Sequence, residues 1–461
     1  MRIYNTLSKQ KEQFKPMNDK NVRMYSCGPT VYMYAHIGNL RAYIFMDVLR
    51  RVLKYNGLQI KHVMNITDVG HLLSDADDGE DKMVKSAKEQ KKSPWEIAEY
   101  YTKVFLEDIE ALNIEKPEII SKATEHIDEM IEFVQGLIDR GYGYKIDDGI
   151  YYDVSKFKEY GSLSGISLEE QWAGARVDVN EEKRHPADFA LWKKAPKEHI
   201  MQWQSPWGMG YPGWHIECSA MSRKYLGDQF DIHTGGVDHI PIHHENEIAQ
   251  SQGLLGIRPV MYWVHGEFLL VDGGKMSKSL GNTYTLRDLK EKGFEPLVYR
   301  FFCFNAHYRS KLNFTWDGLK SAQTSLENLR EGVLAHLNGE HIIEETEVNK
   351  LKEEFEEAIN DDLNIPKAMA VVWSIIKDSR KSKQFRDLLC DFDKVLGLRL
   401  EQVAEKNEEE VEPEIIELVK QRQEARETRN WKAADEIRDK LKGLGIIVED
   451  TPMGPKIKKI E

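Results

Sequence analysis

The sequence predicts an α/β protein with a doubly wound parallel sheet, and neighbouring patterns near the N-terminus support this fold class. Val22–Cys27 has the composition of a short strand, and Gln59–Thr67 resembles a second one. Between them, Asn39–Asn56 carries apolar residues at the spacing of a helix with one buried face. That stripe comprises Leu40, Ile44, Val48 and Val52, widened by Leu49 and Leu53. Gly57 stands where a helix C-cap belongs, so strand, turn, helix and strand form a βαβ unit of Rossmann-like type.

Later segments alternate between helical and strand-like patterns. Ser93–Gly141 is mostly helical, whereas Tyr142–Gln204 contains turns, glycines and short strand-like pieces and is interpreted as an insertion. Strand and loop character returns over Gly208–Gly281, and Glu295–Leu400 is again helical. The acidic stretch Glu401–Pro413 is expected to be a solvated linker.

These patterns divide the chain into an α/β domain interrupted by an insertion, a helical bundle and a small C-terminal domain. In the C-terminal domain a single helix is expected from Pro413 to about Leu441, with basic residues at helical spacing. The predicted boundaries are 1–125 and 208–270 for the two halves of the α/β domain, 126–207 for the inserted connective domain, 271–325 for a loop-rich segment, 326–400 for the helical bundle and 401–461 for the linker and C-terminal domain.

Length and composition exclude several classes of protein. The chain has 461 residues, 41% of them hydrophobic, which is ordinary for a globular protein with more than one domain. Its four cysteines, Cys27, Cys218, Cys303 and Cys390, are too scattered to suggest a disulfide framework. The net charge of −13 argues against a non-specific nucleic-acid binder but is compatible with an enzyme that recognises one RNA. Neither a secretory signal nor an apolar run of membrane-spanning length is visible, so a cytoplasmic location without membrane attachment is expected.

The first candidate nucleotide-binding motif is His36-Ile37-Gly38-Asn39, between the first strand and its helix. Nucleotides bind at this place in doubly wound sheets, beside a helix N-terminus. Gly38 would let the backbone approach a ligand, and His36 and Asn39 can donate hydrogen bonds to phosphate oxygens. Alone the motif is weak, because a histidine before a helix is more often a capping or surface residue.

The second candidate motif is Lys275-Met276-Ser277-Lys278-Ser279, preceded by Asp272-Gly273-Gly274. Two lysines on a glycine-hinged loop can close over a triphosphate and meet the charge that develops on it during transfer. An exposed basic loop without function is the alternative, and the pentapeptide favours the nucleotide-binding interpretation.

Cysteine, histidine and glutamate residues in three segments could form a metal site. Cys27 ends the first strand, Cys218 lies in Gly213–Cys218, and His243 and Glu247 are four residues apart, on one face if helical. Two thiolates, one imidazole and one carboxylate suit tetrahedral zinc. The rival ligands are His233, His239, His244, Glu245 and His265. Spacing alone favours buried cysteines beside a capping histidine cluster over a metal site.

Together, the two nucleotide-binding motifs, about 240 residues apart, resemble the signature sequences of class I aminoacyl-tRNA synthetases. Cys27–Tyr32 leading into His36, then Gly213–Cys218 and His243–Glu247, are similar to cysteinyl-tRNA synthetases in particular. The resemblance implies that one Zn²⁺ is held by Cys27, Cys218, His243 and Glu247, and that the pocket for cysteine is lined by Thr67, Trp214 and His233. It also implies that catalysis depends on His36, Asn39, Lys275 and Lys278. ATP, accompanied by Mg²⁺, would be bound by these four residues and by Gly38 and Ser277.

The activity that the resemblance implies is ATP-dependent activation of L-cysteine to cysteinyl-adenylate, with release of pyrophosphate, and transfer to the 3′-terminal adenosine of tRNA(Cys). Residues 271–325 would then hold the lysine loop and a region contacting the tRNA stem. The tail, with Asn430–Asp435 and Gly445-Ile446, is similar to the family's anticodon-binding module, and a monomer is implied. The alternatives are a cysteine ligase acting on a sugar amine, which would lack that module, and a non-catalytic RNA-binding paralogue, which would tolerate loss of the ATP motifs.

Three features depart from the usual pattern of the family. Asn39 stands where many members have histidine. Asparagine can still donate a hydrogen bond, so this difference bears on the reaction rate and not on the family assignment. The acidic, glycine-containing loop Val69–Asp81 replaces a shorter run, and it carries His71. His239 interrupts a stretch that is more often apolar. Both histidines are interpreted as surface residues, with a role near the metal as the alternative.

Overall fold

The computed structural model describes residues 1–69, 82–166, 181–197, 199–277, 281–403, 413–428, 430–451 and 454–459. The chain forms two compact units, Met1–Leu398 and Arg399–Glu461. Among the helices described, none combines the length and the apolar character needed to span a membrane.

The first unit is built on a five-stranded sheet in which every neighbouring pair of strands is parallel. Its order is β12-β11-β3-β4-β5. The strands are β3 (Asn21–Ser26), β4 (Gln59–Ile66), β5 (Ile119–Lys122), β11 (Phe230–Gly236) and β12 (Val260–Gly266). The order runs outwards from β3 in both directions, so this is a doubly wound sheet, and the predicted fold class is confirmed.

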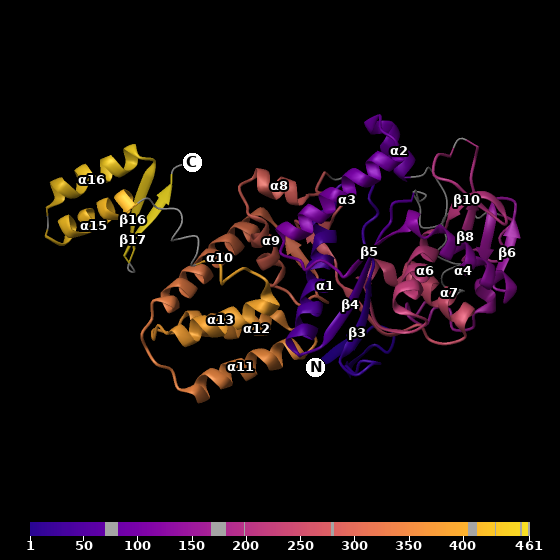
Figure 1. The fold of residues 1–461 in the computed structure, drawn as a ribbon, viewed down its shortest axis with the longest axis horizontal. Helices are drawn as coiled ribbons and strands as arrows, with labels where there is room; N and C mark the ends of the chain where they lie inside the picture. The colour runs from indigo at the N-terminus through magenta and orange to yellow at the C-terminus, as the bar shows by residue number, and fades with distance from the viewer. Residues whose placement is uncertain are drawn as a thin grey trace. The chain divides into compact units, whose positions relative to one another are not determined.

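Helix α1 (Ile37–Tyr55) connects β3 to β4 as the βαβ pattern predicted, although it begins two residues before the expected start. His36 caps it at the N-terminus, and Gly57, with φ of 79°, takes the left-handed conformation just beyond its end. Leu40, Leu49 and Val52 are fully buried. Figure 1 shows α1 lying against the sheet strands β3 and β4.

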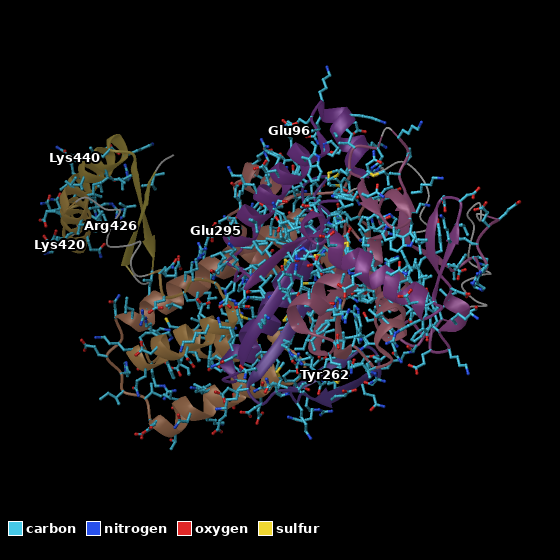
Figure 2. The ribbon with its side chains drawn as sticks, turned by 45° about the vertical axis from the view of Figure 1, so that its right-hand side comes forward. Glu96, Tyr262, Glu295, Lys420, Arg426 and Lys440 are labelled. Carbon is cyan, nitrogen blue, oxygen red and sulfur yellow. The ribbon has the colours of Figure 1, made fainter. Side chains whose placement is uncertain are left out.

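Two further helices, α2 (Lys82–Gln90) and α3 (Pro94–Ala111), precede β5 and pack against each other. Ser93 caps α3 through a reciprocal pair of hydrogen bonds with Glu96, and Pro94 occupies the first turn. Figure 2 labels Glu96 at this end of α3.

The insertion contains a second, antiparallel sheet of order β6-β7-β8-β10-β9. Its strands are β6 (Gly143–Ile146), β7 (Gly149–Tyr152), β8 (Phe189–Lys194), β9 (Trp203–Ser205) and β10 (Gly208–Pro212). Helix α4 (Ile127–Asp139) leads into it, and the one-turn helices η1 (Ala123–Glu125) and η2 (Val154–Lys156) lie beside it in sequence. Phe189, Leu191 and Trp192 of β8 join Ile216 and Trp263 in one hydrophobic cluster, so the insertion shares the core of the main sheet.

The return to the main sheet passes through α6 (Trp214–Leu226), β11, the short helices η3 (Val237–His239) and η4 (Ile240–His244), α7 (Glu245–Leu255) and β12. The segment η4 is a single π-helical turn that runs directly into α7. Such turns occur often at functional sites.

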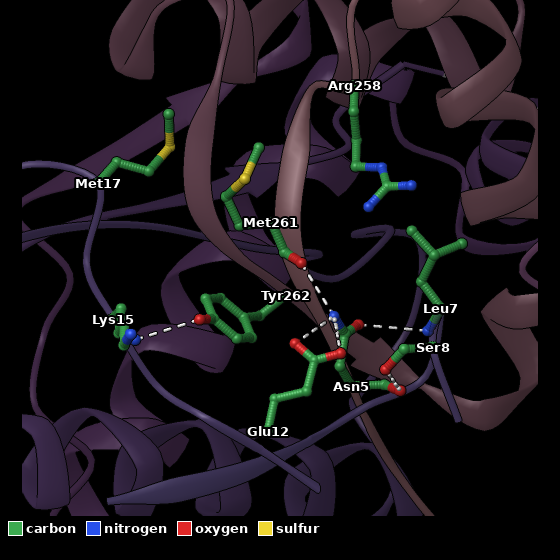
Figure 3. Close-up of a pocket in the computed structure, with 9 residues that line it drawn as sticks. All are labelled: Asn5, Leu7, Ser8, Glu12, Lys15, Met17, Arg258, Met261 and Tyr262. Carbon is green, nitrogen blue, oxygen red and sulfur yellow. Dashed lines mark hydrogen bonds between the residues drawn. The ribbon is translucent and has the colours of Figure 1, made fainter. Parts of the chain in front are cut away.

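The N-terminal hairpin of β1 (Arg2–Asn5) and β2 (Gln10–Gln13) lies beside the edge strand β12. The Asn5 side chain accepts a hydrogen bond from the Trp263 N–H and donates one to the Met261 carbonyl. It thereby pairs two backbone groups that the edge strand would otherwise leave open. A cavity of about 340 Å³ opens between hairpin and strand, with Glu12, Arg258 and Tyr262 in its wall (Figure 3). None of the residues lining it is a predicted site residue.

The rest of the first unit is mainly helical. It includes a small sheet of order β14-β13-β15, made of β13 (Leu269–Val271), β14 (Gly274–Lys275) and β15 (Leu312–Phe314). The helices are α8 (Leu286–Glu291), α9 (Pro296–Cys303), α10 (Trp316–Leu337), α11 (Glu345–Asn360), α12 (Ile365–Ile376) and α13 (Lys383–Leu396). A buried ion pair joins α9 to α1, in which Arg300 Nη2 lies 2.6 Å from Asp47 Oδ2 and neither side chain is exposed.

The second unit differs from the prediction of one helix from Pro413 to Leu441. It contains two helices, α15 (Pro413–Glu427) and α16 (Trp431–Gly443), followed by the hairpin β16 (Ile446–Thr451) and β17 (Gly454–Lys459). The break is explained by Asn430, whose side chain accepts the Ala433 N–H and starts a new helix. Ile415, Leu418 and Leu441 share its small core with residues of β16.

Candidate active site

The first nucleotide-binding motif lies at the N-terminus of α1. His36 Nδ1 accepts the Asn39 backbone N–H at 3.1 Å, and Asn39 Oδ1 accepts the His36 N–H at 3.2 Å. This capping box orients the first turn, whose N–H groups and helix dipole favour a bound anion. The cap uses Nδ1 of His36 and the side-chain carbonyl of Asn39. The His36 Nε2 and the Asn39 side-chain NH₂ therefore remain as the groups that could donate to a phosphate. Capping and ligand binding are therefore compatible at this motif.

The lysine loop meets the first motif in space. A Cβ on Gly38 would stand 3.2 Å from the terminal methyl carbon of Met276, so the two motifs touch at Gly38. Asn282 holds the loop by accepting the Ser277 N–H at 2.8 Å and donating to the Lys275 carbonyl at 3.2 Å. Asn282 was missed in the sequence, although it follows the pentapeptide closely.

The loop starts from a tight hairpin between β13 and β14. Asp272 and Gly273 have positive φ angles of 50° and 77°, and Lys275 is exposed on β14. Lys278, the second lysine of the motif, lies outside the described residues. The structure therefore places Met276 of the lysine loop beside Gly38, with Lys275 next to it in sequence and exposed, and it does not describe Lys278.

The four predicted metal ligands come together from three segments. Cys27 follows the carboxyl end of β3, Cys218 lies in α6, and His243 and Glu247 lie on η4 and α7. All four are buried, and their donor atoms lie within 4.8 Å of one another. Gly28 allows the backbone that follows β3 to pass close to β4, because a Cβ at this position would stand only 1.6 Å from the Asn65 carbonyl oxygen of β4.

Contacts outside the group orient its ligands. His243 Nε2 lies 3.1 Å from Glu247 Oε1, and His243 Nδ1 lies 3.0 Å from Nδ1 of the buried His215. Glu247 Oε2 lies 2.9 Å from His233 Nε2, whereas its buried Oε1 makes no well-aligned hydrogen bond within the described part of the chain. Each of His243 and Glu247 thus has one atom held from behind and one directed towards the group, an arrangement typical of metal ligands.

A second, overlapping group of buried donors replaces Cys218 and His243 by His233 and His244. His244 Nε2 lies 3.2 Å from Cys27 Sγ, and its Nδ1 lies 2.7 Å from His265 Nε2. His265 Nδ1 in turn lies 2.7 Å from the Thr6 hydroxyl oxygen. Geometry therefore offers two ligand sets that share Cys27 and Glu247.

Glu245, another rival ligand, serves the insertion. Its carboxylate accepts the backbone N–H groups of Gly161, Leu163 and Ser164 at 2.9–3.0 Å. Since these bonds occupy both of its oxygens, Glu245 positions a turn of the insertion and is not part of either ligand group.

The electrostatics of the predicted group suit a cation. A hydrogen bond from Cys27, supported by His243, lowers the pKa of the Cys218 thiol to about 7 although burial opposes this. Burial would also raise the pKa of Glu247, but His233 and His243 hold it at about 2. Burial opposes the charged form of His243, yet Glu247 and Cys218 raise its pKa to about 10. Burial and the neighbouring Cys218 and Glu247 raise the pKa of the Cys27 thiol, so the anionic groups beside His243 are Glu247 and the readily ionised Cys218. Two sulfur donors, one imidazole and one carboxylate form a donor set that fits Zn²⁺.

The predicted amino-acid pocket adjoins the metal ligands. The Thr67 hydroxyl donates to Glu217 Oε2 at 2.7 Å and accepts from Asn65 Nδ2 at 3.0 Å. The Trp214 ring lies 4.5 Å from that of His243 between centroids. His233 stacks on Trp263 with centroids 4.6 Å apart, so it lies deep beside Glu247.

One buried acidic residue near this pocket was not singled out in the sequence. Glu217 is fully buried in α6, and its position directly before the predicted ligand Cys218 was the available signal. His239 was expected at the surface, but it is only partly exposed and its ring lies 5.1 Å from those of His243 and His244. Burial lowers the pKa of His239 to about 4. The loop 70–81, including His71, lies outside the described residues.

Comparison with known proteins identifies three family models along the chain. Residues 13–324 match the model of the tRNA synthetases class I (C) catalytic domain, residues 354–401 match a DALR domain, and residues 408–454 match the cysteinyl-tRNA ligase anticodon binding domain. A cysteine–tRNA ligase of Treponema denticola is 46% identical, over 98% of each chain. One from Thermococcus onnurineus is 44% identical, over 100% of this chain and 99% of its own.

Solved structures with a similar fold include more distant synthetases. Mycobacterium tuberculosis methionyl-tRNA synthetase in complex with methionyl-adenylate aligns with a TM-score of 0.57 at 15% identity, over 83% of this chain and 91% of its own. A leucyl enzyme of Agrobacterium radiobacter K84, in a ternary complex with tRNA, aligns with a TM-score of 0.61 at 12% identity, over 85% and 86%. These similarities establish the fold.

Proposed function

The chain belongs to the cysteinyl-tRNA synthetase family, and from this premise we propose that it joins L-cysteine to tRNA(Cys) with ATP as the energy source. Its relatives of that name match it from end to end, and the match includes the anticodon-binding model. The observation that carries the proposal is the convergence of Cys27, Cys218, His243 and Glu247 beside the predicted amino-acid pocket.

These four residues would hold one Zn²⁺. When bound, zinc supplies a soft Lewis acid that prefers a cysteine thiolate to a serine hydroxyl. Shape alone separates near-isosteric substrates by only about 10–200-fold. A thiol-selective site at the binding step would therefore make a separate editing site unnecessary. His215 and His233 orient the ligands, and Thr67, Trp214 and Glu217 would bound the space for the rest of the amino acid.

Activation places charge where the two ATP motifs meet. The cysteine carboxylate oxygen attacks the α-phosphorus of ATP in line, the bond to the bridging oxygen of the β-phosphate breaks, and pyrophosphate leaves. Mg²⁺ bound to the phosphates would neutralise part of their charge. His36 and Asn39 would donate to the phosphates from the α1 terminus, and Lys275 and Lys278 would close from the loop. Positioning and charge stabilisation account for catalysis of this kind. Contact between Gly38 and Met276 supports this pairing of the motifs.

The second step transfers the cysteinyl group to the 3′-terminal adenosine, through its 2′-hydroxyl, and releases AMP. Residues 401–461 would contact the anticodon region, and 271–325 the tRNA stem. We propose a cytoplasmic monomer that acts on free ATP, cysteine and tRNA.

The direct test is to incubate the purified protein with ATP, Mg²⁺, labelled cysteine and total tRNA, and to count label on precipitated RNA. ATP-dependent labelling that excess serine does not compete with is the expected result. If cysteine-dependent pyrophosphate release occurs without RNA labelling, activation stands but the acceptor is wrong, and a sugar-amine ligase becomes the better assignment. Absence of both reactions would refute the proposal and favour a non-catalytic paralogue.

A further inference from the structure

A buried arginine joins the helix of the first ATP motif to the base of the lysine loop. Arg41 is the fifth residue of α1, and its side chain is only 5% exposed. Its Nη1 donates to the carbonyls of Glu267 at 2.8 Å and Phe268 at 2.5 Å. Its Nη2 donates to the carbonyl of Ser310 at 2.5 Å and, in a longer contact of 3.4 Å, to that of His307. One side chain on α1 therefore binds two backbone segments from different parts of the chain.

The two segments held by Arg41 lead directly into the strands that carry the lysine loop. Phe268 immediately precedes β13, and Ser310 lies two residues before β15. These two strands pair in parallel from their first residues onward. Strand β13 then turns back into β14, which ends at Lys275. Arg41 therefore fixes the point at which both strands begin, and the lysine loop starts from the hairpin that they support.

The segment that follows the loop is fixed to the same helix. The Ile37 N–H donates to the Tyr284 carbonyl at 2.8 Å, and His36 and Thr285 form an isolated β-bridge. Helix α9 packs against α1 (Figure 1), and from it the Tyr299 hydroxyl donates to the Ile37 carbonyl at 2.6 Å. The lysine loop therefore starts and ends on a frame that the first turns of α1 define.

Arg41 differs from two other buried arginines of α1 in the groups that it contacts. Arg51 pairs with Asp47 at 2.7 Å, and Arg50 pairs with Glu118 at 2.6 Å. Within the described part of the chain Arg41 forms no ion pair, and its charge is met by backbone carbonyls. A guanidinium presents several donors in a rigid planar fork, which a lysine ammonium does not reproduce. Arg41 is therefore suited to fixing the relative position of backbone segments.

We propose that Arg41 is a positioning residue for cysteine activation, which holds the base of the lysine loop where the loop lysines can meet the phosphates of ATP bound at the first motif; this inference rests on the proposed function. Catalysis by positioning is sensitive to small displacements, since a shift of about 1 Å can reduce a rate about 100-fold. Because its guanidinium is directed to the base of the loop, Arg41 would act through the loop and not on ATP itself.

The test is a double-mutant cycle of Arg41→Lys and Lys275→Ala, with kcat for cysteine-dependent pyrophosphate exchange measured per titrated active site. Lysine keeps the charge but cannot bridge both segments, so Arg41→Lys should lower kcat about 100-fold and leave the KM for cysteine unchanged. If Arg41 acts through the loop, the double variant should match the slower single variant within about twofold, and the two losses should not multiply.

Arg51→Lys is the matched control. Arg51 is also buried on α1, and it also donates to backbone carbonyls, those of Lys394 and Asn113, which lie outside the loop base. This variant should keep the wild-type kcat per active site. Multiplying losses in the cycle, or a wild-type kcat in Arg41→Lys, would overturn the inference. A loss confined to the number of active sites would also overturn it, because it would show a purely structural role.

A second variant tests the same point if Arg41→Lys does not fold. Asn313 of β15 is exposed, and its side chain accepts the Gly273 N–H at 2.7 Å, so Asn313→Ala loosens the hairpin without disturbing the core. It should lower kcat about two- to tenfold, again without multiplying the loss in Lys275→Ala. A wild-type kcat in this variant would overturn the inference. If the wild-type protein charges tRNA while the inference fails, the proposed function stands alone; if it neither exchanges pyrophosphate nor charges tRNA, both fail.

Discussion

Replacing Cys218 with serine tests the metal site most directly. Cys218 is 2% exposed and its donor atom lies within 4.8 Å of those of Cys27, His243 and Glu247. Serine keeps the size of the side chain but offers a hydroxyl that resists deprotonation and binds zinc poorly. The thiol it replaces already has its pKa lowered to about 7, so it would ionise readily next to a metal.

The size of the effect follows from the number of ligands. Structural zinc sites contribute about 10–16 kcal/mol for four ligands, so one ligand accounts for about 2.5–4 kcal/mol. That corresponds to a loss of zinc affinity of about 100- to 1000-fold. Affinity for cysteine should fall with zinc content, whereas ATP binding at the distinct α1 motif should be retained.

The assay is zinc content by atomic emission after dialysis, paired with cysteine-dependent pyrophosphate exchange. Cys303→Ser is the matched control, because Cys303 is also buried but belongs to neither ligand group. Full zinc in the Cys218→Ser variant would refute the assignment. His244→Ala separates the two ligand sets: loss of zinc in that variant, with retention in Cys218→Ser, would favour the set that contains His233 and His244.

Three further outcomes are expected. Burial would raise the pKa of Asp47, but Arg300 and Arg51 hold this pKa below its usual value. The variant Asp47→Asn leaves the Arg300 guanidinium buried without its charged partner, so it should lower the free energy of unfolding by about 3–5 kcal/mol. Because the folded pKa is depressed, this wild-type advantage should be full above the pKa of an unfolded aspartate, about 3.9, and should fade as the pH falls through the folded value. Lys278→Ala should slow pyrophosphate exchange by about 100- to 1000-fold with little change in cysteine binding. A chain ending at Leu398, which keeps the first unit whole, should retain pyrophosphate exchange and lose most tRNA charging.

Each of these outcomes has a contrary result. Urea unfolding should reveal the Asp47 effect, and an equal loss of stability at every pH would show that charge is not its cause. Equal loss of exchange and of cysteine affinity in Lys278→Ala would point to a disrupted site. Normal charging by the shortened chain would contradict a role for 399–461 in tRNA recognition.

Local patterns in the sequence predicted the parts of the fold that local forces decide. The βαβ unit from Asn21 to Ile66 followed from apolar periodicity and from Gly57, because a strand or helix buries one face and needs a cap wherever it lies. The helix break at Asn430 was missed because the basic periodicity continues across it, although asparagine is itself a capping signal. Resemblance to a family, and not spacing, singled out the four ligands of the proposed metal site.

Tertiary structure alone decided how those residues meet. Cys27 and Cys218 are far apart in the sequence. They approach because β11 pairs with β3 in the parallel sheet and α6, which precedes β11, packs against β3. Tertiary structure also gave two nearby glutamates different roles. Glu247 is directed into the ligand group, whereas Glu245 holds the turn Gly161–Ser164. The contacts of His215, His265 and Glu217 also came only from the fold. Periodicity and capping depend on neighbours along the chain, whereas a ligand's orientation depends on side chains that packing brings from distant segments.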